Sequence, residues 1–190
     1  MSETTAVRTV SGRQVPATGK WQVDTRHSVV EFVARHLMVT KVRGHFDDYN
    51  VDLIIAEDPT QSQLDVTIKT DSIVTPDPDR DTHLKGADFL NVEKYPEITF
   101  RSTSIKPDGD DWAVTGDLTV MGVTRPVTLD VEFGGVQVDP WGNSKALFSA
   151  KTEFDRDDFG LSWNQPLAGG GFLIGKRVTV EIEVQASPAA

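Results

Sequence analysis

Hydrophobic and polar residues alternate with a period of two along most of this chain. The segment RVTVEIEVQ, residues 177–185, shows the pattern best, because Val178, Val180, Ile182 and Val184 alternate with polar side chains. Such alternation is typical of a β-strand that buries one face. Seven further segments carry it, so the pattern predicts about eight strands, at residues 28–36, 41–55, 64–70, 98–104, 111–120, 126–133, 145–154 and 177–185.

Two segments depart from the simple alternation. Within residues 41–55 the hydrophobic positions change phase at Asp47 and Asp48, which predicts a β-bulge. Residues 72–96 open with the proline-rich TPDPDR and then predict a few helical turns, with Asp81 or Thr82 as the N-cap. The residues expected to pack this insertion are Leu84, Phe89 and Leu90.

The number and spacing of the strands predict an all-β fold. Eight antiparallel strands in about 165 residues favour an up-and-down barrel or a sandwich, and barrel closure removes exposed strand edges. We therefore expect an eight-stranded antiparallel barrel with a short helical insertion between strands 3 and 4. Residues 1–19 are expected to form a flexible N-terminal arm, residues 20–186 the barrel domain and residues 187–190 a C-terminal tail.

The inward-facing positions of this barrel combine large and small side chains. Phenylalanines such as Phe32 and Phe100 share the inward set with Ala34, Gly44 and Gly116. One interpretation is a filled core in which small residues face large ones. The other is a tunnel, because an eight-stranded barrel is wide enough for one small ligand. His36, on the same apolar face, fits either a hydrogen-bonded core residue or a polar contact for a ligand headgroup.

Composition excludes several classes of partner and of chemistry for this protein. The 190 residues contain 19 basic and 29 acidic side chains, a net charge of −10, which argues against nucleic acid as a partner. The absence of cysteine excludes disulfides and thiolate chemistry. The first twenty residues lack the pattern of a signal peptide, and no apolar run approaches the roughly 18 residues that span a bilayer. These features predict a cytoplasmic protein without an integral membrane segment.

The segment RDTHL, residues 80–84, is the strongest candidate for chemistry. Arg80, Asp81 and His83 stand close together, but a single Asp-x-His is a weak metal signal, and no HExxH, GxSxG or P-loop pattern occurs. The interpretation we favour is structural: Arg80 and Asp81 anchor the long connection against the barrel. We expect no metal, no cofactor and no catalytic residue.

Several of these segments together resemble the YceI family of lipocalin-like, isoprenoid-binding proteins. The resemblance rests on WQVDTRHSVVEFVARHLMVTKVRGHFDDY, on RDTHLKGADFLNVEKYPEITFRST, on GDLTVMGVTRPV, on RDDFGL and on the closing IGKRVTVEIEVQA. It runs from about Lys20 to Ala186, with Lys176 at a position where an acidic residue is common in the family. The resemblance implies a lipocalin-like barrel with a long apolar tunnel, often as a homodimer, and no established reaction.

The resemblance also implies a function. It predicts non-enzymatic binding, storage or transport of an isoprenoid lipid in the tunnel: a polyprenol, a polyprenyl phosphate or an isoprenoid quinone. The alternatives are a small enzyme acting on a hydrophobic substrate, with His36 or His83 as acid or base, and a filled-barrel, stress-related interaction module. The residues expected to line or cover the tunnel are Phe32, Ala34, His36, Phe46, Phe89, Ile98, Phe100, Leu118, Val120, Phe148, Phe159 and Trp163.

Overall fold

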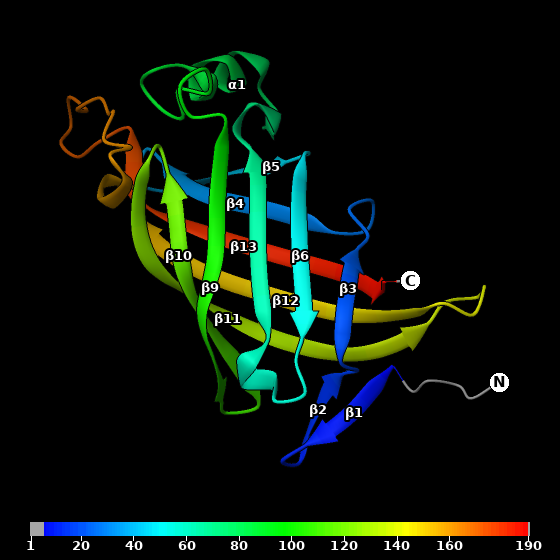
Figure 1. The fold of residues 1–190 in the computed structure, drawn as a ribbon. Helices are drawn as coiled ribbons and strands as arrows, with labels where there is room; N and C mark the ends of the chain where they lie inside the picture. Colours follow the sequence, from blue (N-terminus) through cyan, green and yellow to red (C-terminus); the bar gives the residue numbers. More distant parts are fainter. Residues whose placement is uncertain (1–5, 190) are drawn as a thin grey trace.

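The protein is an antiparallel β structure with one α-helix in the part of the chain that the structure describes, residues 6–189 of a computed structural model (Figure 1). The strands before the helix are β1 (Val7–Val10), β2 (Arg13–Pro16), β3 (Gly19–Val23), β4 (Val29–His36), β5 (Thr40–Phe46), β6 (Tyr49–Ile55), β7 (Gln63–Lys69) and β8 (Ile73–Val74). After helix α1 (Pro78–Lys85) come β9 (Glu97–Asp108), β10 (Asp111–Val120), β11 (Val123–Val138), β12 (Ser144–Asp155) and β13 (Ile174–Pro188). Three 3-10 helices, η1 (Pro59–Gln61), η2 (Thr70–Ser72) and η3 (Arg156–Phe159), complete the elements.

The main sheet closes on itself, which confirms the predicted barrel. Its strand order is β12-β11-β10-β9-β7-β6-β3-β13-β4-β5-β8, and an additional β12–β13 pairing completes the ring. The closing ladder is long, from Ala146 opposite Ala186 to Asp155 opposite Arg177. Strands β3 and β4 both pair with β13, and they act as one bent strand. Strand β6 pairs with β3 and β5 pairs with β4, so β5 and β6 act as a second bent strand of the eight-stranded barrel.

The phase change predicted at Asp47 and Asp48 coincides with the break between β5 and β6. The inward residues of β5 are at even-numbered positions, such as Val42 and Phe46. Those of β6 are at odd-numbered positions, beginning with Tyr49 and Val51. A two-residue interruption is therefore enough to keep the hydrophobic face of the bent strand directed inward. In Figure 1, β9 and β6 run almost upright in front of β11, β12, β13 and β4, which cross the view behind them.

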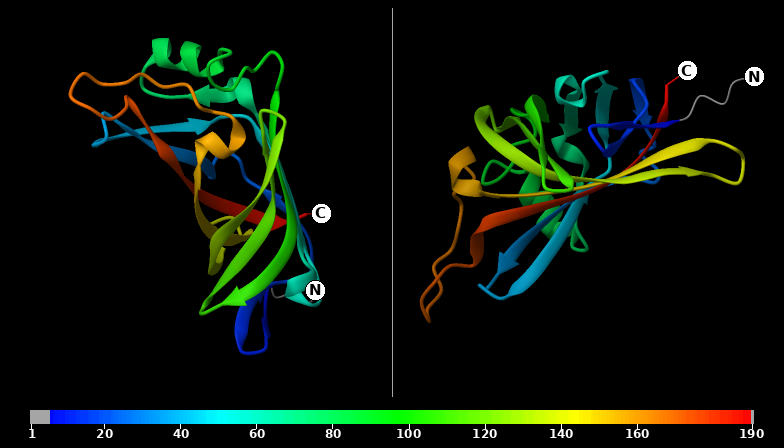
Figure 2. Two further views of the ribbon diagram at one scale, coloured as in Figure 1. Left: turned by 90° about the vertical axis from the view of Figure 1, so that its left-hand side faces the viewer. Right: turned by 90° about the horizontal axis from the view of Figure 1, so that it is seen from below.

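Helix α1 lies between β7 and β9, as predicted, but it begins earlier than the sequence indicated. Its N-cap is Asp77, whose carboxylate accepts hydrogen bonds from the backbone N–H groups of Asp79 and Arg80. The prediction of Asp81 or Thr82 as the cap is wrong, because Pro78 starts the helix with the fixed φ that favours the first helical position. The helix covers one end of the barrel (Figures 1 and 2).

A separate hairpin of β1 and β2 lies at the other end of the barrel (Figure 2). It falls within residues 1–19, for which the sequence predicted a flexible arm; residues 1–5 lie outside the described residues. The Arg8 guanidinium donates hydrogen bonds to the carbonyl oxygens of Pro16, at 3.2 Å, and Ala56, at 2.5 Å. Val15 and Pro16 of β2 are buried, so the hairpin packs as part of the domain.

Candidate functional site: an apolar cavity inside the barrel

The barrel encloses a cavity of about 410 Å³. This volume lies within the range of roughly 300–1,000 Å³ that is typical of small-molecule sites. Its wall consists largely of alternate residues of the surrounding strands, most of them valine, leucine, isoleucine and phenylalanine. The wall extends from Leu84 and Phe89 under the helical insertion to Val15 and Pro16 of the β1–β2 hairpin. Such a space fits an apolar molecule.

Most of the residues expected to line a tunnel form part of this wall. Phe159 and Trp163 are the two exceptions. Phe159 is 1% exposed and packs in the core, with its ring centroid 5.1 Å from that of Phe154. The residues that do line the cavity are Phe32, Ala34, His36, Phe46, Phe89, Ile98, Phe100, Leu118, Val120 and Phe148.

The interior combines close packing with open space. A Cβ atom at Gly44 would overlap the ring of Phe32, and one at Gly116 would overlap the ring of Phe100. At these two positions small residues accommodate large ones, as the filled-core interpretation expected. The cavity nevertheless remains beside these packed pairs, so both interpretations describe part of the interior.

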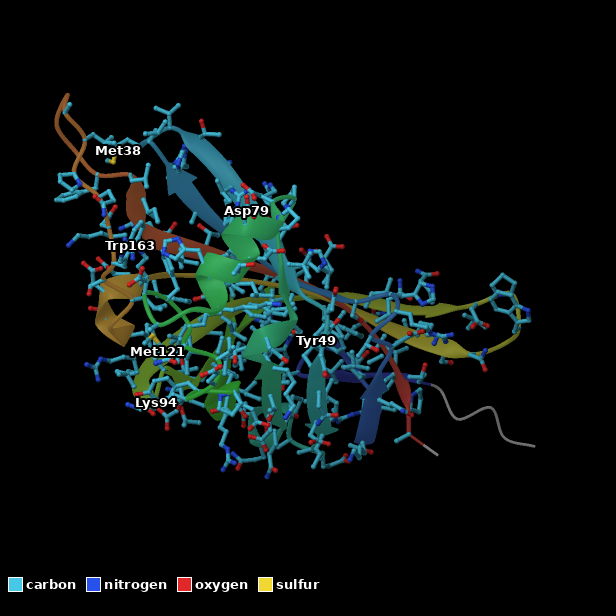
Figure 3. All side chains as sticks on the ribbon, turned by 90° about the horizontal axis from the view of Figure 1, so that it is seen from above. Met38, Tyr49, Asp79, Lys94, Met121 and Trp163 are labelled. Atoms are coloured by element: carbon cyan, nitrogen blue, oxygen red, sulfur yellow. The ribbon has the colours of Figure 1, made fainter. Side chains whose placement is uncertain are left out.

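An aromatic cluster joins α1 to the loop before β13. The ring centroid of His83 lies 4.9 Å from that of Phe89 and 4.7 Å from that of Trp163, both edge-to-face. His83 Nε2 also lies 2.9 Å from Asp88 Oδ2. Phe89 lines the cavity, and the ring centroid of Trp163 lies 5.3 Å from that of Phe89, so Trp163 packs against a residue of the cavity wall; Figure 3 labels its position, viewed from above.

The RDTHL segment is anchored through Thr75, a buried residue that follows β8. Asp81 Oδ1 accepts hydrogen bonds from the backbone N–H of Thr75, at 2.8 Å, and from its hydroxyl, at 2.6 Å. Arg80 Nε donates to the same hydroxyl oxygen at 3.1 Å, and Arg80 Nη2 lies 3.6 Å from Asp77 Oδ2. These bonds fix the insertion to the sheet, and Arg80 additionally forms part of the cavity wall.

The other histidines are dispersed over the structure. His27 Nδ1 lies 3.0 Å from Asp24 Oδ2, and His45 Nε2 lies 3.0 Å from Asp47 Oδ1. Residues 6–189 contain no group of three or more His, Asp or Glu side chains arranged to hold a metal ion. Over the same residues, no helix is both long enough and apolar enough to cross a membrane.

Two buried polar residues of the wall escaped the sequence analysis. Tyr49 and Arg156 line the cavity, and the Tyr49 hydroxyl and Arg156 Nη2 lack a hydrogen-bond partner within the described chain. Burial raises the pKa of Tyr49, with smaller contributions from Asp24 and Asp47. Arg156 follows a strand and stands among aspartates in DRDDF, a pattern typical of a solvated turn. The segment RDDFGL that begins with it entered only as part of the family resemblance, and the local pattern does not indicate its burial.

These features define a class of protein: a closed antiparallel β-barrel with a ligand-sized apolar interior and a helical insertion at one end. The chain belongs to the YceI family, because the family model of the YceI-like domain matches residues 21–186. It is 42% identical over 152 residues to "Protein YceI" of Escherichia coli, with 80% of each chain covered.

Solved structures share the fold. BcnA of Burkholderia cenocepacia is similar with a TM-score of 0.75 and 22% identity, covering 87% of this chain and 99% of that one. A polyisoprenoid-binding domain from Saccharophagus degradans, implicated in plant cell wall breakdown, has a TM-score of 0.64 and 14% identity. That alignment covers 91% of this chain and 100% of the other.

Proposed function

We propose that the protein binds the hydrocarbon chain of an isoprenoid lipid inside the barrel, and stores or carries it without catalysing a reaction. The observation that carries this proposal is the apolar cavity of about 410 Å³. The polyisoprenoid-binding domain with the same fold supports the ligand class. A polyprenol, a polyprenyl phosphate and an isoprenoid quinone all provide the required chain.

Burial of the chain provides the main driving force. Each buried CH₂ group contributes roughly 0.8 kcal/mol, so a chain of about twenty carbons gains on the order of 15 kcal/mol before opposing terms. Immobilising the chain and losing its free motion oppose binding by a large part of this amount. The remainder is sufficient for micromolar or tighter binding without a specific polar contact.

The test identifies the lipid that is bound to the purified protein and then asks whether that lipid lies in the cavity. Native mass spectrometry and organic extraction of protein from its own source should reveal a bound isoprenoid lipid. Protein that is free of lipid and also fails to bind added polyprenols and quinones contradicts the proposal.

A substitution locates the ligand. Ala34 lines the cavity, so Ala34→Trp should fill part of it and abolish binding while the barrel stays folded. Lys41→Trp, at an exposed position of the neighbouring strand β5, is the matched control and should bind normally. Unchanged lipid occupancy in a folded Ala34→Trp variant places the ligand elsewhere.

A further inference from the structure

Four large apolar side chains are exposed together at one end of the barrel. Val39 is 72% exposed, Met38 56%, Phe172 49% and Leu37 48%. Leu37 to Val39 form the turn between β4 and β5, and Phe172 belongs to the loop before β13. These four residues are called the apolar tip below. Exposed apolar residues that gather in this way mark a contact surface more often than scattered ones do.

The two segments of the apolar tip lie against each other. The backbone N–H of Leu37 donates to the carbonyl oxygen of Leu173 at 2.8 Å. A Cβ atom at Gly171 would lie 3.6 Å from Cγ of Met38, an ordinary contact distance. Figure 3 shows Met38 between the end of the β4–β5 hairpin and the loop before β13. The apolar tip therefore combines side chains from two segments that are in contact.

The turn carries apolar side chains where other residue types are favoured. Leu37 has a φ of 50° and Met38 has a φ of 64°. Glycine, asparagine and aspartate are the usual residues in this left-handed region. Leucine and methionine here combine an unfavourable backbone conformation with exposure of apolar surface to water. Neither property stabilises the fold, so the apolar tip fits a contact with another apolar phase.

The charge around the apolar tip is opposite in sign to that of the whole chain. Residues 32–46 and 159–180 contain five Lys or Arg residues and no Asp or Glu, in a chain whose net charge is −10. Three of the five form salt bridges with carboxylates of other segments. Within residues 6–189, Arg35 is one of the two that do not, and its Nη1 donates to the carbonyl oxygen of Val39 at 2.9 Å. Cations beside an exposed apolar surface complement the anionic headgroups of a membrane.

Two carboxylates also lie near the base of the apolar tip. Glu153 and Asp155 share a surface depression with Met38. Glu153 is the salt-bridge partner of Arg177, at 3.1 Å, and Asp155 accepts a hydrogen bond from the backbone N–H at the start of η3. Both carboxylates therefore have partners within the protein, whereas the charge of Arg35 is not neutralised by a salt bridge.

We propose that the apolar tip docks on the surface of an anionic lipid bilayer, and that the cargo enters and leaves the cavity at this end. The cavity wall reaches the base of the tip, because Arg35, His36 and Ile174 form part of it. An apolar chain that crossed water between bilayer and barrel would lose its hydrophobic stabilisation on the way, so direct contact favours transfer. The passage of the lipid rests on the proposed function, whereas the docking itself requires no cargo.

Vesicle flotation tests the docking without any cargo. The wild-type protein is mixed with vesicles of phosphatidylcholine alone, or of equal parts of phosphatidylcholine and phosphatidylglycerol. We expect about tenfold more protein to float with the anionic vesicles, and high salt should remove most of this difference by screening. Absence of flotation with both vesicles overturns the docking proposal and leaves cargo binding in the cavity standing.

Variants then assign the docking to the apolar tip. Val39→Ser combined with Phe172→Ser should lower the floated fraction about tenfold, because it removes the apolar contact. The matched control combines Val138→Ser with Trp141→Ser, since both residues are large, apolar and exposed at the β11–β12 hairpin. The control should float like the wild type. An equal loss in both variants, or no loss in the tip variant, overturns the assignment. Val39→Ser alone should show part of the loss, and it decides the matter if the double variant does not fold.

Two further measurements complete the test. Uptake of the apolar dye Nile red from anionic vesicles should be about tenfold slower in the tip variant, while its dissociation constant in vesicle-free solution stays unchanged. Equal uptake rates overturn the route of entry. Sedimentation distinguishes a bilayer from a second copy of the chain as the partner. A wild-type dimer that becomes a monomer in the tip variant, with no flotation of either protein, overturns the proposal in favour of self-association.

Discussion

The ring of Phe32 on β4 occupies the space in which a side chain on Gly44 of β5 would lie. The two residues are partners in the β4–β5 ladder, and both belong to the inward face of the barrel. A Cβ atom at position 44 would overlap Phe32 Cζ and would lie 2.9 Å from Cγ2 of Thr75. The absence of a side chain at Gly44 therefore sets how far the Phe32 ring extends across the interior.

Gly44→Ala should force the Phe32 ring to move and should lower the free energy of unfolding by about 1–3 kcal/mol, the usual cost of overpacking. Chemical denaturation measures the change. Gly134→Ala on β11 is the control, because the nearest atom to its Cβ would be Cβ of Leu147 at an ordinary 3.4 Å. Equal stability of the two variants would show that the Phe32 ring is not confined.

Asp24 should contribute stability that is lost in acid. Its hydrogen bond with His27, joined by one from the backbone N–H of Arg26, lowers its pKa to about 2 from 3.8. Because the folded pKa is depressed, the contribution is complete above about pH 4 and disappears as the pH falls through about 2. Asp24→Asn should lower the free energy of unfolding at neutral pH by about 1–2 kcal/mol.

The pH dependence of this difference is the diagnostic measurement. Unfolding curves of wild-type and Asp24→Asn protein between pH 7 and pH 2 should converge at the acid end. Asp65→Asn, at an exposed position on β7, serves as the control and should differ little from wild type at any pH. A gap that stays constant down to pH 2 contradicts the depressed pKa of Asp24.

Asp81→Ala should loosen the helical insertion. The substitution leaves the backbone N–H of the buried Thr75 without its acceptor, which costs about 1–3 kcal/mol. Hydrogen exchange should accelerate across residues 75–90 more than in the strands of the barrel. Asp79→Ala, an exposed position of the same helix that is labelled in Figure 3, should accelerate exchange far less. Similar hydrogen-exchange rates in both variants would show that the bonds between Thr75 and Asp81 do not anchor the insertion.

Trp163→Ala should speed the release of a bound ligand. The substitution removes the ring that packs on His83 and Phe89, so the connection between α1 and the loop before β13 opens more readily. Stopped-flow dissociation of Nile red should become several-fold faster. Trp141→Ala is the matched control, because Trp141 is 84% exposed at the tip of the projecting β11–β12 hairpin (Figure 2). Equal dissociation rates in the two variants would mean that Trp163 does not restrict exit.

The period-two pattern predicted the barrel because the inward face of each strand is largely apolar, and nine of the ten expected residues that line the cavity lie on these strands; the tenth, Phe89, belongs to the helical insertion. The predicted start of the helix was wrong because Asp77, Asp79 and Asp81 all satisfy the preference for an N-cap. Pro78 identifies Asp77 as the cap, since proline favours the first helical position. The hairpin also had a signal. Ser11-Gly12 lies between two short alternating segments, and both residues adopt positive φ, as a tight hairpin turn requires.

The polar part of the site could not be predicted in the same way. Arg156 and Tyr49 belong to the cavity wall because tertiary packing buries them, and within residues 6–189 each has a buried polar atom without a hydrogen-bond partner. Neither local pattern nor residue type reports this condition. His83 likewise belongs to an aromatic cluster whose members, Phe89 and Trp163, come from different segments of the chain.

The short pairing of β8 with β5 has a consequence for self-association. Within residues 6–189, the outer edge of β5 is paired only at His45 and Phe46, so Thr40 to Arg43 have no strand partner on that side. An edge of this kind is a template onto which a strand from another molecule can add. Exposed Lys41 places a positive charge along it, whereas Arg43 forms salt bridges with Glu31 and Glu181 on the other side of β5; a lysine on an open edge opposes fibril-like stacking.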